Sequence, residues 1–77
     1  MEILLLQLQT GKKAKIKRLE GGYSFQRKLA SLNIRVGKTI KKVTTQPLGG
    51  PVVIEVDNTE VTLGMGMAMK IFVEIKK

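Results

Sequence analysis

The sequence contains no cysteine and no histidine, and it has only three aromatic side chains. The absence of cysteine excludes disulfide bonds and thiolate metal sites. The absence of histidine removes the most common general base and the most common transition-metal ligand. The six acidic residues are spread along the chain, whereas catalytic carboxylates occur in pairs or clusters. These absences predict a protein that is not an enzyme and carries no cofactor.

Long hydrophobic segments are also missing. The apolar run at residues 3–6 is too short for the hydrophobic region of a signal peptide, and no basic residue precedes it. Nothing approaches the roughly 20 apolar residues of a membrane span. A chain of 77 residues has room for one hydrophobic core. We therefore expect residues 1–77 to form a single cytoplasmic domain.

Positive charge is what the sequence has in excess, with a net charge of +8. Residues 1–42 hold eleven of the fourteen lysines and arginines but only two of the six acidic residues. This asymmetry indicates an acidic protein partner, an anionic membrane surface or nucleic acid, with a merely solubilising surface as the alternative. Proteins that bind single-stranded nucleic acid interleave basic residues with stacking aromatics. Because aromatics are scarce here, nucleic acid is the less favoured partner. A small-molecule substrate is not expected either.

Alternation of apolar and polar residues predicts five short strands. They lie at residues 13–17, from about Thr39 to Thr45, at 52–56, at 60–63 and at 70–77. In the last of them Ile71, Val73 and Ile75 should point inward, and Phe72 and Glu74 outward. Five short strands cover their apolar faces most economically by rolling into a small barrel. The sequence thus predicts a mainly β fold.

Two irregularities are expected within this barrel. Ile40 and Val43 are three positions apart, so a β-bulge near Lys41 and Lys42 is needed to restore the alternation. The segment "DNT" at 57–59 predicts a tight hairpin, because aspartate and asparagine tolerate positive φ. The loop "PLGGP" at 47–51 connects the second and third strands.

The segment "YSFQRKLASLNI" has the period of a short helix, placed after the first strand. Phe25, Leu29 and Leu32 fall at i, i+4 and i+7 and form one apolar stripe. Ser24 is the expected N-cap and Asn33 the expected C-cap. The stripe should plug one open end of the barrel. For Leu29 and Leu32, an apolar contact reached by a partner is the alternative.

Three methionines, Met65, Met67 and Met69, alternate within "LGMGMAMKI". An extended segment would place the three sulfurs on one face, as a thioether site for Cu(I) requires. Gly64 and Gly66 instead favour a turn that enters a short helical piece, "MAMK", before the last strand. Methionine commonly fills irregular gaps in cores. We therefore interpret these side chains as packing or adaptable surface and not as metal ligands.

Three motifs together resemble the family of the ferrous-iron transport protein A, FeoA. They are "LASLNI" at 29–34, "PLGGP" at 47–51 and "LGMGMAMKIFV" at 63–73, and the resemblance covers about residues 5–75. Asn33 stands where the family usually has glycine, and asparagine also tolerates the left-handed conformation. The resemblance implies an SH3-like barrel with a helical insertion. It also implies an accessory of the ferrous-iron transporter FeoB that acts at the cytoplasmic, GTPase-bearing portion of the transporter.

The same barrel is similar to the C-terminal domain of metal-dependent repressors of the diphtheria-toxin-repressor type. No winged-helix domain precedes it here, which disfavours a repressor.

The family name suggests transition-metal binding, but sites for Fe²⁺ are usually built from imidazole, thiolate or clustered carboxylates. We therefore expect no bound iron. An SH3-type groove for proline-rich peptides is not expected either, because such grooves are lined by aromatics.

The candidate partner-binding surface combines the helix with the chain that follows it. Basic side chains on this surface could steer docking onto an acidic face of the transporter or hold the protein near anionic lipid at the inner face of the membrane. The outward Phe72 and the "LGGP" loop are secondary candidates, and Phe72 or an exposed strand edge could also support weak self-association. The predicted binding residues are Arg27, Lys28, Leu29, Arg35, Lys38, Lys41, Lys42 and Phe72.

Overall fold

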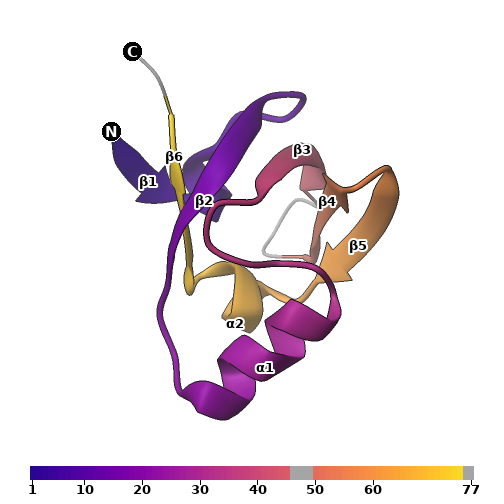
Figure 1. Ribbon diagram of the computed structural model, residues 1–77. Coiled ribbons are helices and arrows are strands. Elements are labelled where there is room, and N and C mark those ends of the chain that lie inside the picture. Colours follow the sequence, from indigo (N-terminus) through magenta and orange to yellow (C-terminus); the bar gives the residue numbers. More distant parts are fainter. Residues whose placement is uncertain (46–49, 76–77) are drawn as a thin grey trace.

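The computed structural model describes residues 1–45 and 50–75. Within them the chain forms six strands, two short α-helices and one 3₁₀ turn (Figure 1). In chain order these are β1 (Glu2–Leu4), η1 (Leu5–Gln7), β2 (Lys13–Leu19), α1 (Tyr23–Ser31), β3 (Thr39–Thr45), β4 (Val52–Val56), β5 (Thr59–Leu63), α2 (Met65–Ala68) and β6 (Ile71–Glu74). The five predicted strands and the predicted helix are all present.

The strands form one antiparallel sheet in the order β1-β6-β2-β3-β4-β5, which curls around the core as a small barrel (Figure 1). The mainly β fold is therefore confirmed. The strand β1 was not predicted from the sequence. It has only three residues, and its pairing partner β6 lies at the other end of the chain, with Ile3 opposite Val73. Local periodicity cannot reveal so short a strand.

Alternate residues of the strands point into the core, as the period of two requires. Ile71 and Val73 are fully buried, Ile75 is half-buried against the core, and Phe72 and Glu74 lie on the outer side. The buried apolar side chains are Leu5, Leu8, Ala14, Ile16, Leu29, Ile34, Ile40, Val52, Ile54, Val56, Leu63, Ala68, Ile71 and Val73. They come from the strands, from α1, α2 and η1, and from the segments that follow α1 and η1.

The helix α1 covers one end of the curled sheet, as predicted (Figure 1). Leu29 is fully buried, and Phe25 and Leu32 pack partly buried against the core. The prediction of Ser24 as N-cap was wrong, because the helix begins at Tyr23 and Gly22 is the capping residue. A side chain at Gly21 would be strained, because its φ is +146° and a Cβ there would overlap the ring of Phe25.

The far end of α1 closes with a Schellman motif. The capping residue is Leu32, one position before the predicted Asn33. Asn33 is left-handed as expected, with φ +66°, and its N–H donates to the carbonyl of Ala30 (2.9 Å). The N–H of Ile34 donates to the carbonyl of Leu29, also at 2.9 Å. This motif reverses the chain immediately after the helix.

Both predicted irregularities of the sheet are found. The register between β3 and β4 shifts between Lys42 and Thr44, so the extra residue is Val43, one position after the predicted site. The hairpin between β4 and β5 turns at Asp57 and Asn58, which have φ values of +51° and +63°. The loop predicted at 47–51 lies mostly outside the described residues.

The methionine segment is helical and not extended. The helix α2 begins at Met65, two residues before the predicted "MAMK" piece. Met67 packs partly buried against the core, whereas Met69 is 55% exposed. Since a helical segment turns these side chains in different directions, the sulfurs do not share one face.

Candidate partner-binding site

A pocket of about 270 Å³ lies where α1 meets the chain that returns after it. The Schellman motif at Asn33 turns the backbone so that Arg35 and Val36 face the same space as Arg27 of the helix. We call this space the helix-end pocket. Its lining residues are Leu19, Tyr23, Gln26, Arg27, Ala30, Ile34, Arg35 and Val36.

The helix-end pocket combines apolar surface with two guanidinium groups. Tyr23 is 76% exposed and Val36 is 63% exposed, and both line the same pocket. The guanidinium carbon of Arg27 lies 5.6 Å from the centroid of the Tyr23 ring, close enough for a cation–π contact. Ile34, which is fully buried, also lines the pocket.

The charges of this pocket are available to a partner. Within residues 1–45 and 50–75, neither Arg27 nor Arg35 forms an ion pair. Lys38, by contrast, pairs with Asp57 of the β4–β5 hairpin at 2.8 Å, so part of its charge is already satisfied. Lys28 is exposed on α1 but does not line the pocket.

The structure places two of the predicted binding residues inside the protein, which confirms the favoured burial of Leu29 over its alternative as a partner contact and corrects the surface assignment of Lys42. Leu29 is fully buried and holds α1 on the core. Lys42 is only 3% exposed, because the bulge comes after it and the regular alternation from Ile40 places it on the same inward face. Neither side chain can contact a partner in this conformation.

The buried Lys42 has a structural role. Its ammonium group donates hydrogen bonds to the carbonyls of Leu6 (2.8 Å) and Leu8 (2.7 Å), which close the turn η1. Burial lowers the pKa of Lys42 below its usual value, because the charged form loses its hydration. This lysine therefore ties the N-terminal segment to β3.

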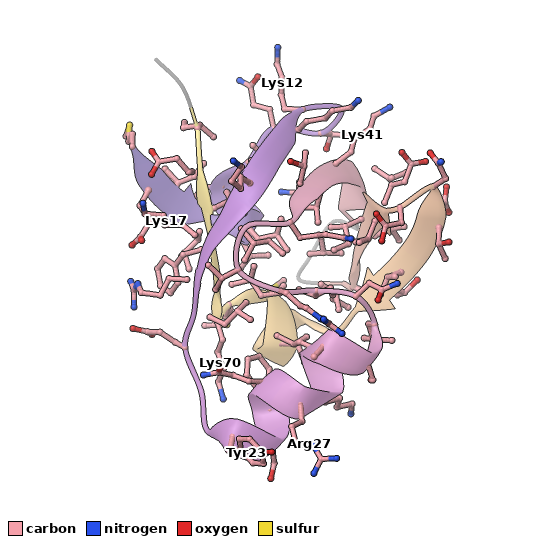
Figure 2. All side chains as sticks on the ribbon, viewed as in Figure 1. Lys12, Lys17, Tyr23, Arg27, Lys41 and Lys70 are labelled. Atoms are coloured by element: carbon pink, nitrogen blue, oxygen red, sulfur yellow. The ribbon has the colours of Figure 1, made fainter. Side chains whose placement is uncertain are left out.

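The remaining two candidates lie apart from the helix-end pocket. Lys41 is at the opposite end of the molecule from Arg27 and Tyr23 (Figure 2). Phe72 is half-buried, and the guanidinium carbon of Arg18 lies 4.0 Å from the centroid of its ring. The continuous basic patch expected between Arg27 and Lys42 does not exist.

Sequence reasoning missed Tyr23 and Val36 as members of the site. Tyr23 is four residues before Arg27, the spacing that places two helical side chains side by side, so it could have been found. Val36 could not, because its position depends on the chain reversal after Asn33.

Within residues 1–45 and 50–75, no group of three or more histidine, cysteine, aspartate or glutamate side chains is placed to hold a metal ion. None of the helices in this part of the chain has the length and apolar character needed to cross a membrane.

Comparison with known proteins shows the family of the chain. The family model described as "FeoA domain" matches residues 3–75. A putative Fe(2+) transport protein A of Methanocaldococcus jannaschii is 33% identical over 64 residues, which cover 83% of this chain and 76% of that protein.

Solved structures agree with this match. The crystal structure of an iron uptake regulatory protein, FeoA, superposes with a TM-score of 0.85 at 27% identity, covering 96% of both chains. A manganese-dependent transcriptional repressor superposes with a TM-score of 0.84 at 20% identity over 94% of this chain and 40% of the repressor, a likeness that shows the fold alone. The predicted SH3-like barrel is therefore confirmed, and the chain belongs to the FeoA family, which is associated with ferrous-iron transport.

Proposed function

We propose that this protein is a non-enzymatic cytoplasmic accessory of a FeoB-type ferrous-iron transporter, acting as one domain over residues 1–77. It binds the cytoplasmic portion of the transporter through the helix-end pocket and thereby works at the inner face of the membrane. Ferrous iron is the cargo of the transporter and is not held by this chain.

The observation that carries the proposal is the composition of the helix-end pocket. Arginine and tyrosine are, with tryptophan, the side chains enriched at the energetic centres of protein interfaces, and here Arg27 and Tyr23 lie side by side. Arg27 and Arg35 can each grip a carboxylate with two hydrogen bonds, which lysine cannot do. Tyr23 and Val36 supply exposed apolar surface, and burying this surface against a partner would favour binding.

The pocket also defines the chemistry of the partner surface. A pocket of about 270 Å³ admits one or two side chains and is too small for a folded element. A complementary surface therefore presents one apolar side chain that enters between Tyr23 and Val36. It also carries aspartate or glutamate on either side, to meet the two guanidinium groups.

The test is a binding titration with the purified cytoplasmic domain of the transporter of the same organism. The double variant Arg27→Glu, Arg35→Glu is expected to bind about 100-fold more weakly, since two attractive charges become repulsive. The control is Lys12→Glu, Lys13→Glu, which changes the net charge equally at the opposite end of the molecule. Equal affinity of the two variants would contradict the proposed site, and no binding by the wild-type protein would contradict the proposed partner.

The alternative function is nucleic-acid binding by a small basic barrel, which the net positive charge suggests. Only one aromatic side chain, Tyr23, is largely exposed in the described residues, so a stacking platform is lacking. The two charge-reversal variants distinguish these functions. If net charge alone holds an oligonucleotide, both variants should bind it equally weakly.

A further inference from the structure

The end of the barrel opposite α1 carries a second concentration of positive charge, which the proposed docking does not use. Lys12, in the turn before β2, and Lys41, on β3, lie at this end (Figure 2). Lys13 and Lys15 are at the start of β2 and line the same cleft as Lys12, and Lys13 is opposite Lys41. We call these four residues the lysine end. None of them forms an ion pair within residues 1–45 and 50–75.

The lysine end contains a like-charge pair that weakens the isolated fold. Lys13 and Lys41 are directly opposite each other in the antiparallel pairing of β2 and β3. Like charges at such positions repel and destabilise the sheet. Glu55, opposite Lys41 on β4, offsets part of this charge. An anionic surface that neutralises both lysines would relieve the repulsion, so the pair favours an anionic ligand.

These lysines are presented by a firmly held turn. The N–H of Gly11 donates to the carbonyl of Lys42 (2.7 Å), and the N–H of Lys42 donates to the carbonyl of Lys12 (3.0 Å). The buried ammonium of Lys42 fixes the preceding segment through Leu6 and Leu8. The turn at residues 9–12 therefore does not have to become ordered when it meets a ligand.

A cleft of about 830 Å³ opens beside the same lysines. Its polar lining includes Lys12, Lys13, Lys15, Gln7, Gln9 and Thr39, all of which can donate hydrogen bonds to an anion. The acidic residue in the lining, Glu74, is already paired with Lys17 and with the N-terminal amine. The cleft therefore places three lysines beside an apolar lining of Ile3, Leu8, Ala14 and Ile75, and it has room for phosphate-bearing headgroups.

We propose that the lysine end rests on an anionic lipid surface. Lysine keeps a strongly hydrated point charge on a flexible stem, which suits a mobile layer of headgroups better than a fixed protein epitope. The lysine end has no arginine or aromatic side chain of the kind that anchors protein interfaces or stacks on bases. Because this end is opposite the helix-end pocket, lipid and transporter can be engaged at the same time (Figure 2).

This inference rests on the proposed function only for the identity of the membrane, which is the one that holds the transporter. Its test needs no transporter. The protein is mixed with phosphatidylcholine vesicles that contain phosphatidylglycerol and with vesicles of phosphatidylcholine alone, and the bound fraction is measured by flotation. Wild-type protein should bind only the anionic vesicles. The double variant Lys12→Gln, Lys13→Gln should bind about 25-fold more weakly, at roughly 5-fold for each lysine near the surface.

A matched control has the same net charge as that variant. Arg27→Gln, Arg35→Gln should bind the anionic vesicles within about 3-fold of wild type, because these side chains face away from the lipid. If both variants lose affinity equally, diffuse charge explains the binding and the proposal fails. It fails also if wild-type protein does not bind anionic vesicles, or if free glycerol phosphate displaces it from them, which would identify a soluble anion as the ligand.

A second measurement reports orientation directly. Because the chain has no cysteine, Thr10→Cys and Ser24→Cys each provide one site for an environment-sensitive fluorophore. The label at Thr10, in the exposed turn, should shift to the blue on anionic vesicles, while the label at Ser24 on α1 should not. A shift at Ser24 alone would reverse the assigned orientation and overturn the proposal. Whatever the outcome, the transporter titration is unaffected, so the two proposals can fail separately.

Discussion

The two ends of this barrel are both basic, but they are built differently. At the helix end, Arg27 and Arg35 lie around a small pocket with exposed Tyr23 and Val36. At the lysine end, the charges surround a larger cleft without aromatic side chains. Guanidinium groups beside an exposed aromatic ring favour a specific protein contact, whereas ammonium groups without aromatic neighbours favour a diffuse anionic surface. Net charge by itself conceals this division.

The largest expected effect concerns the support of the helix end. Leu29→Ala should lower the free energy of unfolding by about 3 kcal/mol, because a fully buried leucine leaves a cavity beneath α1. Urea denaturation measures this change. Under conditions where the variant remains folded, its affinity for the transporter domain should be close to wild type. A loss of affinity with unchanged stability would instead return Leu29 to the contact surface.

The corresponding change at the lysine end is Lys42→Met. Removing the ammonium leaves the carbonyls of Leu6 and Leu8 without their donor, which should lower stability by about 2 kcal/mol. The control is Lys41→Met, a half-buried neighbour whose replacement should change stability by less than about 0.5 kcal/mol. Equal effects of the two substitutions would contradict the structural role of Lys42.

The same residue predicts a dependence on pH. The folded protein holds the proton of Lys42 more weakly than the unfolded chain does, because burial lowers the pKa below 10.5. The unfolded state therefore binds more protons just below that value, and the free energy of unfolding should rise as pH increases toward it. Lys42→Met should lack this rise. Denaturation curves of both proteins between about pH 8 and pH 10 make the comparison.

A smaller effect distinguishes the apolar from the charged part of the helix-end pocket. Tyr23→Ala should weaken binding of the transporter domain about 10-fold, or about 1.4 kcal/mol, without measurable loss of stability, since this ring is mostly exposed. Tyr23→Phe keeps the ring beside Arg27 and should bind nearly as wild type. If Tyr23→Ala binds normally while Arg27→Glu does not, the contact is purely electrostatic and resembles the lysine end.

The smallest effect is at the reversal that brings Arg35 to the pocket. Asn33→Gly should stabilise the protein by a few tenths of a kcal/mol, because glycine adopts positive φ without steric cost. Asn33→Ala should destabilise it by about 1 kcal/mol for the opposite reason. The melting temperatures of the two variants should therefore fall on either side of wild type. Melting temperatures in the reverse order would mean that the side chain of Asn33 makes a stabilising contact of its own.

The sequence predicted most of the sheet because alternation reports burial directly, as in β4 and β6. It did not predict β1, whose partner is distant in the chain, or the inward direction of Lys42. The alternation that starts at Ile40 does place Lys42 inside, but its charge argued for the surface. Only the two buried carbonyl acceptors explain how an ammonium group is tolerated there.

The candidate site was predicted in part. Arg27 and Arg35 were named from the sequence, but they were expected to belong to a surface that extended to Lys42. The positions of strands in the sheet separate Lys41 from the helix, and this separation is a property of topology that local pattern does not contain. Val36 joins the site only because the chain reverses at Asn33, whereas helical spacing places Tyr23 beside Arg27.

The most direct test of the account is an amide-resolved NMR titration of labelled protein with the cytoplasmic domain of the transporter. We expect the resonances of Tyr23, Arg27, Arg35 and Val36 to shift, while those of Lys12, Lys13 and Lys15 stay in place. Such a result would establish that the helix end alone contacts the transporter. Shifts centred on the lysine end, with an unchanged helix end, would contradict the central claim.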